Sequence, residues 1–350
     1  MTVVAEQYTY VVGADTHART HTYAVVEAAT GRLTGQATFP ASGPGMSRAL
    51  AWIAREAPGP VLAAVEGTGS YGAGLNAALK NAGIPVAEAH PPKRVERRHG
   101  KSDAIDAEAA ARSVLRQHVE LLATPRAGKI RAALRILLGS RRTMDSQRTA
   151  DRNALTALTR STDLGVDARR PLTDRQVREI AAWRIHPTDD VEQHAARSEA
   201  SRLARSGLAL TIELRRNLDE LRKHSKTLAP GLLEKPGIGP FTAAIMLTAW
   251  SHPGRVRSEA AFAALAGAAP IPASSGNTSR HRLNRHGDRQ LNRALDIVAR
   301  ARLSCDPDTQ AYAQRRQAEG RTRREIRRIL KRYIAHQIFR ELTNIHTGAA

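Results

Sequence analysis

Cysteine is almost absent from this sequence of 350 residues, which contains only Cys305. A single cysteine can form no intramolecular disulfide and no Cys-x-x-Cys zinc site, so both kinds of centre are excluded, and we expect a reducing cytoplasm. Long apolar runs are also absent, because none approaches the ~18 residues of a membrane span. The first ten residues, MTVVAEQYTY, lack the basic-then-apolar pattern of a signal peptide. We therefore expect no membrane partner.

Acidic and aromatic residues are scarce relative to basic ones. Asp and Glu number 33 against 54 Lys and Arg, which gives a net charge of +21. The positive electrostatic field of this charge favours a polyanionic partner. Hydrophobic residues make up 41% of the chain, which is too many for a disordered basic tail. Aromatic residues make up only 4%, so base stacking cannot dominate binding. We therefore predict a folded protein that contacts the nucleic-acid backbone and recognises the shape of the duplex.

The positive charge is unevenly distributed along the chain. The first 110 residues contain ten basic and ten acidic residues, so the whole excess lies in residues 111–228 and 229–350. One neutral module is thus followed by two basic ones. This order favours catalysis or metal binding by the first module and binding of a phosphate backbone by the other two.

The first module alternates strands and helices. Residues 8–13, YTYVVG, alternate and are rich in β-branched and aromatic types, and residues 20–40 predict two further strands joined by a turn at Thr30 and Gly31. Helices are expected near 45–57 and 75–82, with strands at 61–66 and 84–89 between and after them. Residues 1–125 are therefore predicted to form an α/β domain.

The remaining chain is predicted to be all-α. Apolar residues at three-and-four spacing in residues 126–228 favour a long helical hairpin or coiled coil, with a break at 161–175. Residues 229–350 predict a mainly α C-terminal domain that begins at KPGIGP and ends in a basic helix. The expected fold class is α/β plus all-α, in three domains.

Four carboxylates in the first module are candidate metal ligands. Asp15 follows the first strand and Glu66 ends the strand VLAAVE, while Asp103 and Asp106 are three residues apart and share one helix face. Hard oxygen ligands in this arrangement suit two Mg²⁺ ions that polarise a phosphodiester. The alternative is that the acids are ordinary turn and helix-start residues. The nearby His17 and His21 could contact a metal or a proton, but we interpret them as surface residues.

These acids and their flanks resemble a known family. Their order on an α/β unit is similar to the DEDD tetrad of RuvC-type resolvases, which have an RNase H-like fold. The flanks VVGADTHARTHTYAVVEAATG, VEGTGSYG and KSDAIDAEAAA look more specifically like the insertion sequence 110 transposase family of bridge-RNA-guided recombinases. The resemblance implies a RuvC-like DEDD domain over the first ~120 residues.

The third module contains two candidate nucleic-acid contacts. Gly237 and Gly239 lie in EKPGIGPFTAAIML, which resembles a helix-hairpin-helix that presents backbone N–H groups to a phosphate, but a plain turn between core helices fits the spacing equally. Downstream, a serine-rich loop precedes a run of cations that could clamp a phosphate: Arg280, Arg282, Arg285, Arg289 and Arg293. By itself this pattern favours a flexible loop leading into a phosphate-gripping helix.

The same stretch is similar to the C-terminal transposase domain of the insertion sequence 110 family. The shared pattern comprises Pro236 to Gly239, Gly267 to Pro270, the Ser275-Gly276 pair and the stretch 286–289. The resemblance implies that Ser275 is the nucleophile, with Ser274 as the alternative. The chain departs from the family pattern at His286 and at residues 277–278.

The sequence therefore predicts an insertion-sequence transposase that cuts and rejoins donor and target DNA through a phosphoserine intermediate and a Mg²⁺ site. The resemblance adds a bridge RNA as guide, and dimers or tetramers acting in the cytoplasm at the nucleoid. One alternative is a metal-dependent nuclease, similar to a Holliday-junction resolvase, in which Ser275 is structural. Another is a non-catalytic nucleic-acid-binding protein.

Overall fold

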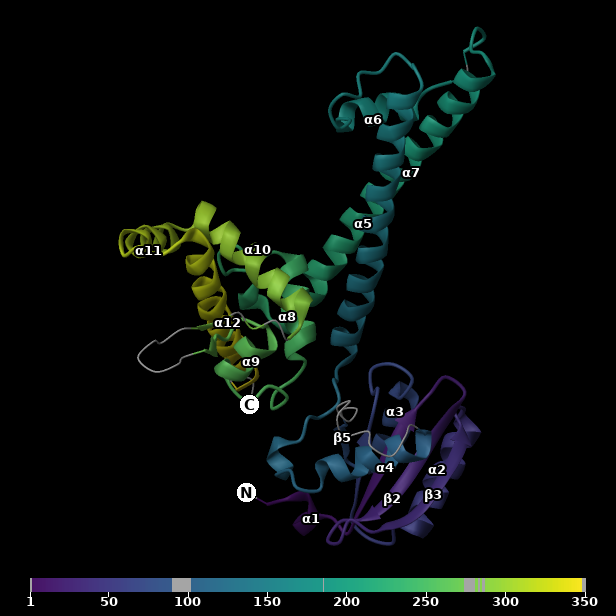
Figure 1. The fold of residues 1–350 in the computed structure, drawn as a ribbon, viewed down its shortest axis with the longest axis vertical. Helices are drawn as coiled ribbons and strands as arrows, with labels where there is room; N and C mark the ends of the chain where they lie inside the picture. Colours follow the sequence, from purple (N-terminus) through teal and green to yellow (C-terminus); the bar gives the residue numbers. More distant parts are fainter. Residues whose placement is uncertain are drawn as a thin grey trace. The chain divides into compact units, whose positions relative to one another are not determined.

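The computed structural model describes residues 2–89, 102–184, 186–273, 281–282, 284 and 287–347. The chain divides into two compact units, Met1–Ala127 and Gly128–Ala350 (Figure 1). The division of the second unit into a helical middle and a separate C-terminal domain at residue 228 stays a prediction.

A five-stranded sheet forms the centre of the first unit. Its strands are β1 (Tyr10–Thr16), β2 (Thr20–Glu27), β3 (Leu33–Pro40), β4 (Val61–Val65) and β5 (Val86–Glu88), in the order β3-β2-β1-β4-β5. β2 is antiparallel to β1 and β3, whereas β1, β4 and β5 run parallel. The predicted strands and the α/β class of this unit are confirmed.

Helices cover both faces of this sheet. The helices are α1 (Val4–Gln7), α2 (Gly43–Glu56), α3 (Ala73–Asn81) and α4 (Asp103–Val114), and a 3₁₀ turn follows at Val119–Leu121. Trp52 and Leu75 from α2 and α3 pack on one face, and Ala110 and Val114 from α4 pack on the other. Because both faces are covered, β1 is buried along nearly its whole length.

Gly13 lets α4 approach the centre of the sheet. A Cβ atom on this residue would lie 1.9 Å from the carbonyl oxygen of Ala107 and 2.6 Å from the backbone nitrogen of Ala111, both in α4. Only hydrogen fits in that space. The absent side chain therefore sets how close the start of α4 comes to the end of β1.

Two long antiparallel helices extend through the second unit. α5 (Lys129–Ser161) and α7 (Val191–Leu228) lie side by side, and the shorter α6 (Asp174–Ala181) packs on α7 (Figure 1). Arg141 donates to the Leu214 carbonyl oxygen at 2.8 Å, and Ser206 donates to Asp151 at 2.7 Å. The predicted hairpin is confirmed, but the connection is longer than 161–175 and contains α6. Coiled-coil packing stays a prediction.

Short helices complete the second unit. After a 3₁₀ turn (Pro230–Leu232) come α8 (Pro240–Trp250), α9 (Glu259–Leu265), the paired strands β6 (Ile271–Pro272) and β7 (His281–Arg282), then α10 (Arg289–Cys305), α11 (Pro307–Ala318) and α12 (Arg323–Thr347). α8 is buried on nearly every side because α7, α5 and α10 surround it. Leu134 and Leu221 of the long helices belong to the same apolar core.

No helix within the described part of the chain is long and apolar enough to cross a membrane.

Candidate active site

The carboxyl ends of two parallel strands bring Asp15 and Glu66 to one edge of the sheet. Ala14 pairs with Val65, and the Glu66 backbone N–H donates to the Ala14 carbonyl oxygen at 3.1 Å. The hydroxyl of Thr16 donates to the Glu66 carbonyl oxygen at 2.9 Å, which holds the two strand ends together. Adjacent parallel strands lie about 4.8 Å apart, so the two acidic residues occupy neighbouring positions.

The start of α4 supplies the other two acids. Ser102 caps the helix by accepting a hydrogen bond from the Ile105 backbone nitrogen at 3.3 Å. Asp103 and Asp106 therefore lie in the first turn, where the exposed N–H groups of the helix favour negative charge. Asp106 is half-buried and Asp103 is exposed.

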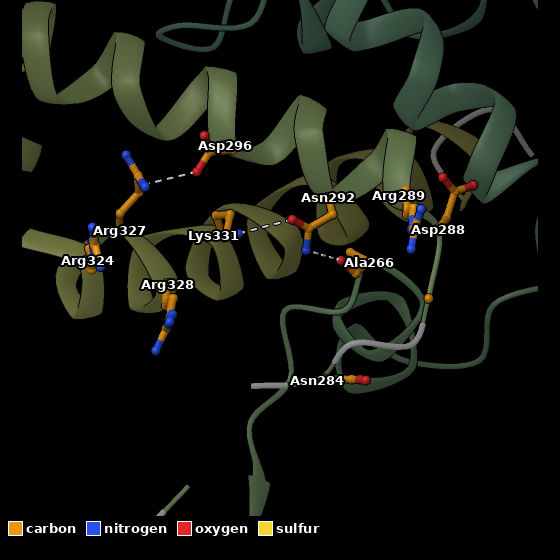
Figure 2. A pocket seen from close by; sticks show the side chains of 11 residues that line it. Ala266, Asn284, Asp288, Arg289, Asn292, Asp296, Arg324, Arg327, Arg328 and Lys331 are labelled. Carbon is orange, nitrogen blue, oxygen red and sulfur yellow. Dashed lines mark hydrogen bonds and ion pairs between the residues drawn. The ribbon is translucent and has the colours of Figure 1, made fainter. Parts of the chain in front are cut away.

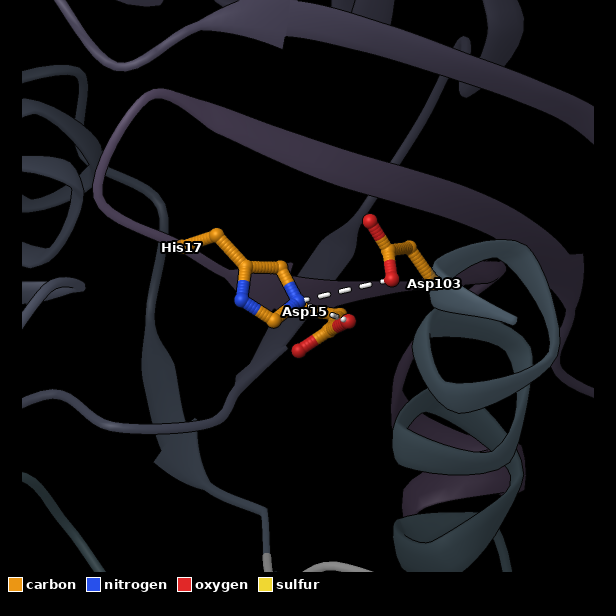
Figure 3. Close-up of side chains that lie close together, drawn as sticks. All are labelled: Asp15, His17 and Asp103. Carbon is orange, nitrogen blue, oxygen red and sulfur yellow. Dashed lines mark hydrogen bonds and ion pairs between the residues drawn. The ribbon is translucent and has the colours of Figure 1, made fainter. Parts of the chain in front are cut away.

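Asp15, His17 and Asp103 converge at this edge, as Figure 3 shows. His17 Nε2 lies 3.0 Å from Asp15 Oδ2 and 3.5 Å from Asp103 Oδ1. The Asp15 side chain is only 10% exposed, whereas those of His17 and Asp103 are 50% and 55% exposed. The site thus has a buried carboxylate at its base and an open side through which a substrate could approach.

The donor set fits a divalent cation. One potential ligand atom from each of the three residues lies within 4.8 Å of the others. Carboxylate oxygens suit Mg²⁺ and Mn²⁺, and an imidazole nitrogen adds affinity for Mn²⁺ and later transition metals. Glu66 and Asp106 are not in this three-residue group, and their role as further metal ligands stays a prediction.

His17 is the residue that the sequence interpretation undervalued. It lies in the tight turn between β1 and β2, where its backbone N–H donates to the Thr20 carbonyl oxygen at 3.1 Å. As predicted it is exposed, but it also contacts two predicted metal ligands. The available signal was the Asp-x-His spacing, because residues two apart in extended chain point to the same side.

The surface interpretation of His21 is wrong. His21 is 2% exposed within β2, and its Nδ1 lies 3.1 Å from the Thr20 carbonyl oxygen. Burial lowers the pKa of this imidazole, and the nearby His17 lowers it further, against the opposing effects of the Thr20 carbonyl and Asp15. His21 therefore belongs to the packed sheet, where its burial favours the neutral form.

The glycine turn at the start of α8 is packed against α10. Gly237 has a φ of 72°, and a Cβ atom there would lie 3.1 Å from the Val298 carbonyl oxygen. Arg302 of α10 donates from Nε to the Pro236 carbonyl oxygen at 2.8 Å. Gly239 precedes α8 with open space beside its Cα. Phosphate binding by Gly237 and Gly239 stays a prediction.

Several predicted residues of the C-terminal site lie outside the described residues: Ser274, Ser275, Arg280 and Arg285. Arg282 in β7 and Arg289 and Arg293 in α10 are described, and all three side chains are exposed. Asp288 caps α10 by accepting from the backbone nitrogens of Gln290 and Leu291. The roles of these serines and arginines in binding or catalysis stay predictions.

Two family models match the chain in separate stretches. A model of the IS110-type DEDD transposase, described as a transposase, matches residues 12–162 and includes the Asp15, His17 and Asp103 cluster. A second model, described as transposase of the IS116/IS110/IS902 family, matches residues 229–314. The chain belongs to the IS110 family of transposases.

A curated relative agrees with this family. The IS110-family chain is 39% identical over 97 residues to the "Insertion element IS110 uncharacterized 43.6 kDa protein" of Streptomyces coelicolor. The match covers 27% of this chain and 24% of the relative, so the chain spans about a quarter of the relative's length.

Proposed function

We propose that this IS110-family protein is the transposase of an insertion sequence and that it cuts and rejoins DNA. The convergence of Asp15, His17 and Asp103 carries the proposal, since it creates a candidate cation site at an open edge of the sheet. The order β3-β2-β1-β4-β5, with β2 antiparallel to its neighbours, supports an RNase H-like, RuvC-like unit.

Asp15 and Asp103 would hold Mg²⁺, and Glu66 and Asp106 would serve a second ion. Bound Mg²⁺ supplies charge that polarises a phosphodiester and stabilises the oxygen leaving it. Asp15 is nearly buried, so it would keep its position as substrate arrives, while the exposed Asp103 can adjust to the metal.

Ser275 would be the nucleophile, as the family resemblance implies. Its hydroxyl oxygen attacks the phosphorus, the bond between phosphorus and the deoxyribose oxygen breaks, and the proton from serine ends on the departing hydroxyl. The strand is then joined to Ser275 as a phosphodiester. A hydroxyl of the partner DNA strand then attacks the same phosphorus, the bond between phosphorus and the serine oxygen breaks, and the proton of the attacking hydroxyl ends on the released serine. Arginines near the loop would neutralise the phosphate.

A bridge RNA would pair with donor and target DNA, and dimers or tetramers would hold the two DNAs together. The net charge of +21 supports simultaneous binding of several nucleic-acid strands. A substrate of chromosomal DNA would place the protein at the nucleoid.

Substitution of Ser275 tests the proposed function. The protein, with its co-purifying RNA, would be incubated with donor DNA, target DNA and Mg²⁺, and denaturing gels would detect protein-DNA adducts and exchanged strands. Ser275→Ala should abolish both products, whereas the matched control Ser274→Ala should retain them. Asp15→Asn should reduce both by at least about a hundredfold, because it removes a metal-binding charge.

The opposite result would identify a different enzyme. Mg²⁺-dependent cutting without an adduct, unchanged in Ser275→Ala, would make the protein a metal-only nuclease and remove the serine step. Binding without any cleavage in the parent protein would contradict transposase activity altogether.

A further inference from the structure

A cavity of about 290 Å³ lies between α10 and α12 in the second unit (Figure 2). Cationic side chains dominate its lining: Arg289, Arg324, Arg327, Arg328 and Lys331. No aromatic residue lines it within the described part of the chain. A site of this composition suits an anion instead of a nucleobase, which binds through stacking.

The two carboxylates in the cavity are already engaged. Asp288 accepts hydrogen bonds from the first backbone N–H groups of α10, and Asp296 lies 3.1 Å from Arg327 and 3.2 Å from Arg300. By contrast, the side chains of Arg289, Arg324 and Arg328 have no hydrogen bond or ion pair with any residue that the structure describes, although Glu325 of the neighbouring cavity attracts Arg328 at longer range. Five cationic side chains therefore line this cavity against two carboxylates, which leaves an excess of positive charge.

Lys331 forms the inner part of this charge cluster. Its Nζ donates to Asn292 Oδ1 at 3.1 Å, and Asn292 Nδ2 donates to the Ala266 carbonyl oxygen at 2.7 Å (Figure 2). The bond to Ala266 orients the Asn292 amide so that its oxygen faces the lysine. Burial lowers the pKa of Lys331, against the opposing effect of Asp296, so a bound anion would stabilise its charged form.

A second cavity of about 550 Å³ continues the basic surface along α12. It shares Asn284, Arg328 and Lys331 with the first cavity and adds Arg332. Arg324, Arg328 and Arg332 are four residues apart, so they form a row on one helix face with steps of about 6 Å. This basic row joins the two cavities and is long enough to follow an extended anionic chain.

The second cavity borders the strand that follows the proposed nucleophile in the chain. β6 and β7 pair through Ile271 and Arg282, and the chain between these strands contains Ser274 and Ser275. Arg282 lines the second cavity, and Asn284 lines both. The second cavity, which Arg328 and Arg332 of the basic row line, thus borders β7, the strand after the serine segment.

We propose that the cavity between α10 and α12 binds a non-scissile backbone phosphate of the DNA strand that Ser275 attacks. Lys331 and Arg328 are its central contacts, while Arg324 and Arg332 engage neighbouring phosphates along the basic row. The inference rests on the proposed function, because that function makes DNA the substrate. It adds a strand-positioning site on α12, a helix that the predicted arginine set did not include.

Salt-dependent DNA binding by the full protein tests this site. Arg328→Ala and Lys331→Met should each lower affinity about tenfold at low salt, since each removes a charge-assisted hydrogen bond. The slope of log affinity against log salt should shrink by about 0.9 for each phosphate that the variant no longer neutralises. Arg323→Ala is the matched control, because Arg323 is exposed on the same helix and lines neither cavity.

A neutral phosphate in the DNA provides the sharper experiment. Methylphosphonate would be placed singly at each position around the cleavage site, and binding would be measured for the parent protein and Arg328→Ala. At one position the methylphosphonate should weaken DNA binding by the parent protein. It should not weaken binding by Arg328→Ala any further, because both changes remove the same interaction.

Three results would overturn the site. They are equal losses of affinity in Arg323→Ala and Arg328→Ala, additive losses at every methylphosphonate position, and weakened binding of the co-purified RNA with DNA binding unchanged. The phosphate site and the proposed function can fail separately. If one methylphosphonate position weakens binding only in the parent protein but no strand exchange occurs, the site is supported and the function is contradicted. If strand exchange occurs but no such position exists, the function is supported and the site is contradicted.

Discussion

His17 links two carboxylates that would otherwise repel each other. Its Nε2 lies within 3.5 Å of both Asp15 and Asp103, so the imidazole is placed either to donate to them or to share a metal with them. An imidazole ligand favours Mn²⁺ over Mg²⁺, because Mg²⁺ prefers oxygen and holds its water firmly. We therefore expect the metal preference of the site to depend on this side chain.

We expect His17→Ala to weaken Mn²⁺ binding by about tenfold or more and Mg²⁺ binding much less, which would reduce the preference between the two ions. Metal titration of the protein without nucleic acid, monitored by Mn²⁺ electron paramagnetic resonance, measures the metal affinities directly. Arg19→Ala is the control, since Arg19 is exposed in the same turn and its side chain is outside the metal cluster. Unchanged Mn²⁺ affinity in His17→Ala would show that the imidazole leaves when metal binds.

At the scale of elements, the packing of α4 on β1 determines whether the site forms. Asp103 comes from the first turn of α4, and Asp15 comes from the end of β1. The two elements touch closely because Gly13 faces the backbone of α4 at Ala107 and Ala111. The distance between the carboxylates is therefore set by a residue that has no side chain.

Gly13→Ala should push α4 away from the sheet, because the added Cβ would lie 1.9 Å from the Ala107 carbonyl oxygen. We expect a loss of about 1–3 kcal/mol in the free energy of unfolding, together with weaker Mn²⁺ binding. Urea unfolding and metal titration of the same samples measure both. In the control Gly74→Ala, the new Cβ would lie 3.5 Å from the end of the Met46 side chain, so stability should hold or rise. A stable Gly13→Ala protein with normal metal affinity would contradict this account.

At the scale of the whole molecule, the candidate metal cluster and the basic cavities belong to different units. The two apolar cores of the first unit contain only residues up to 122, and the candidate metal cluster lies within the same unit. The basic cavities and the basic row lie entirely in the second unit. The neutral and basic modules of the sequence thus correspond to separate parts of the structure.

Residues 1–127 expressed alone should fold cooperatively and keep their Mn²⁺ affinity, because their cores need no residue from the second unit. Their affinity for DNA should fall at least about a hundredfold and lose most of its salt dependence, since nearly all the excess charge is absent. Circular dichroism melting, metal titration and filter binding test the three statements. A fragment that remains unfolded with Mn²⁺ present, or that binds DNA like the full chain, would contradict this division.

The sequence by itself determined the strands of the first unit, the two long helices and the candidates Asp15 and Asp103, because strand and helix patterns repeat over a few residues. It left α6 undetected, because eight residues in a polar connection provide only two turns of pattern. It interpreted His21 as exposed, although the pairing of β2 with strands on both sides buries it.

Only the tertiary structure joined His17 to Asp103 and created the cavity between α10 and α12. Both arrangements bring together residues far apart in the chain, and the distance between them depends on how closely whole elements pack. That closeness depends on contacts such as Gly13 against α4, whose partners cannot be identified from neighbouring residues in the sequence.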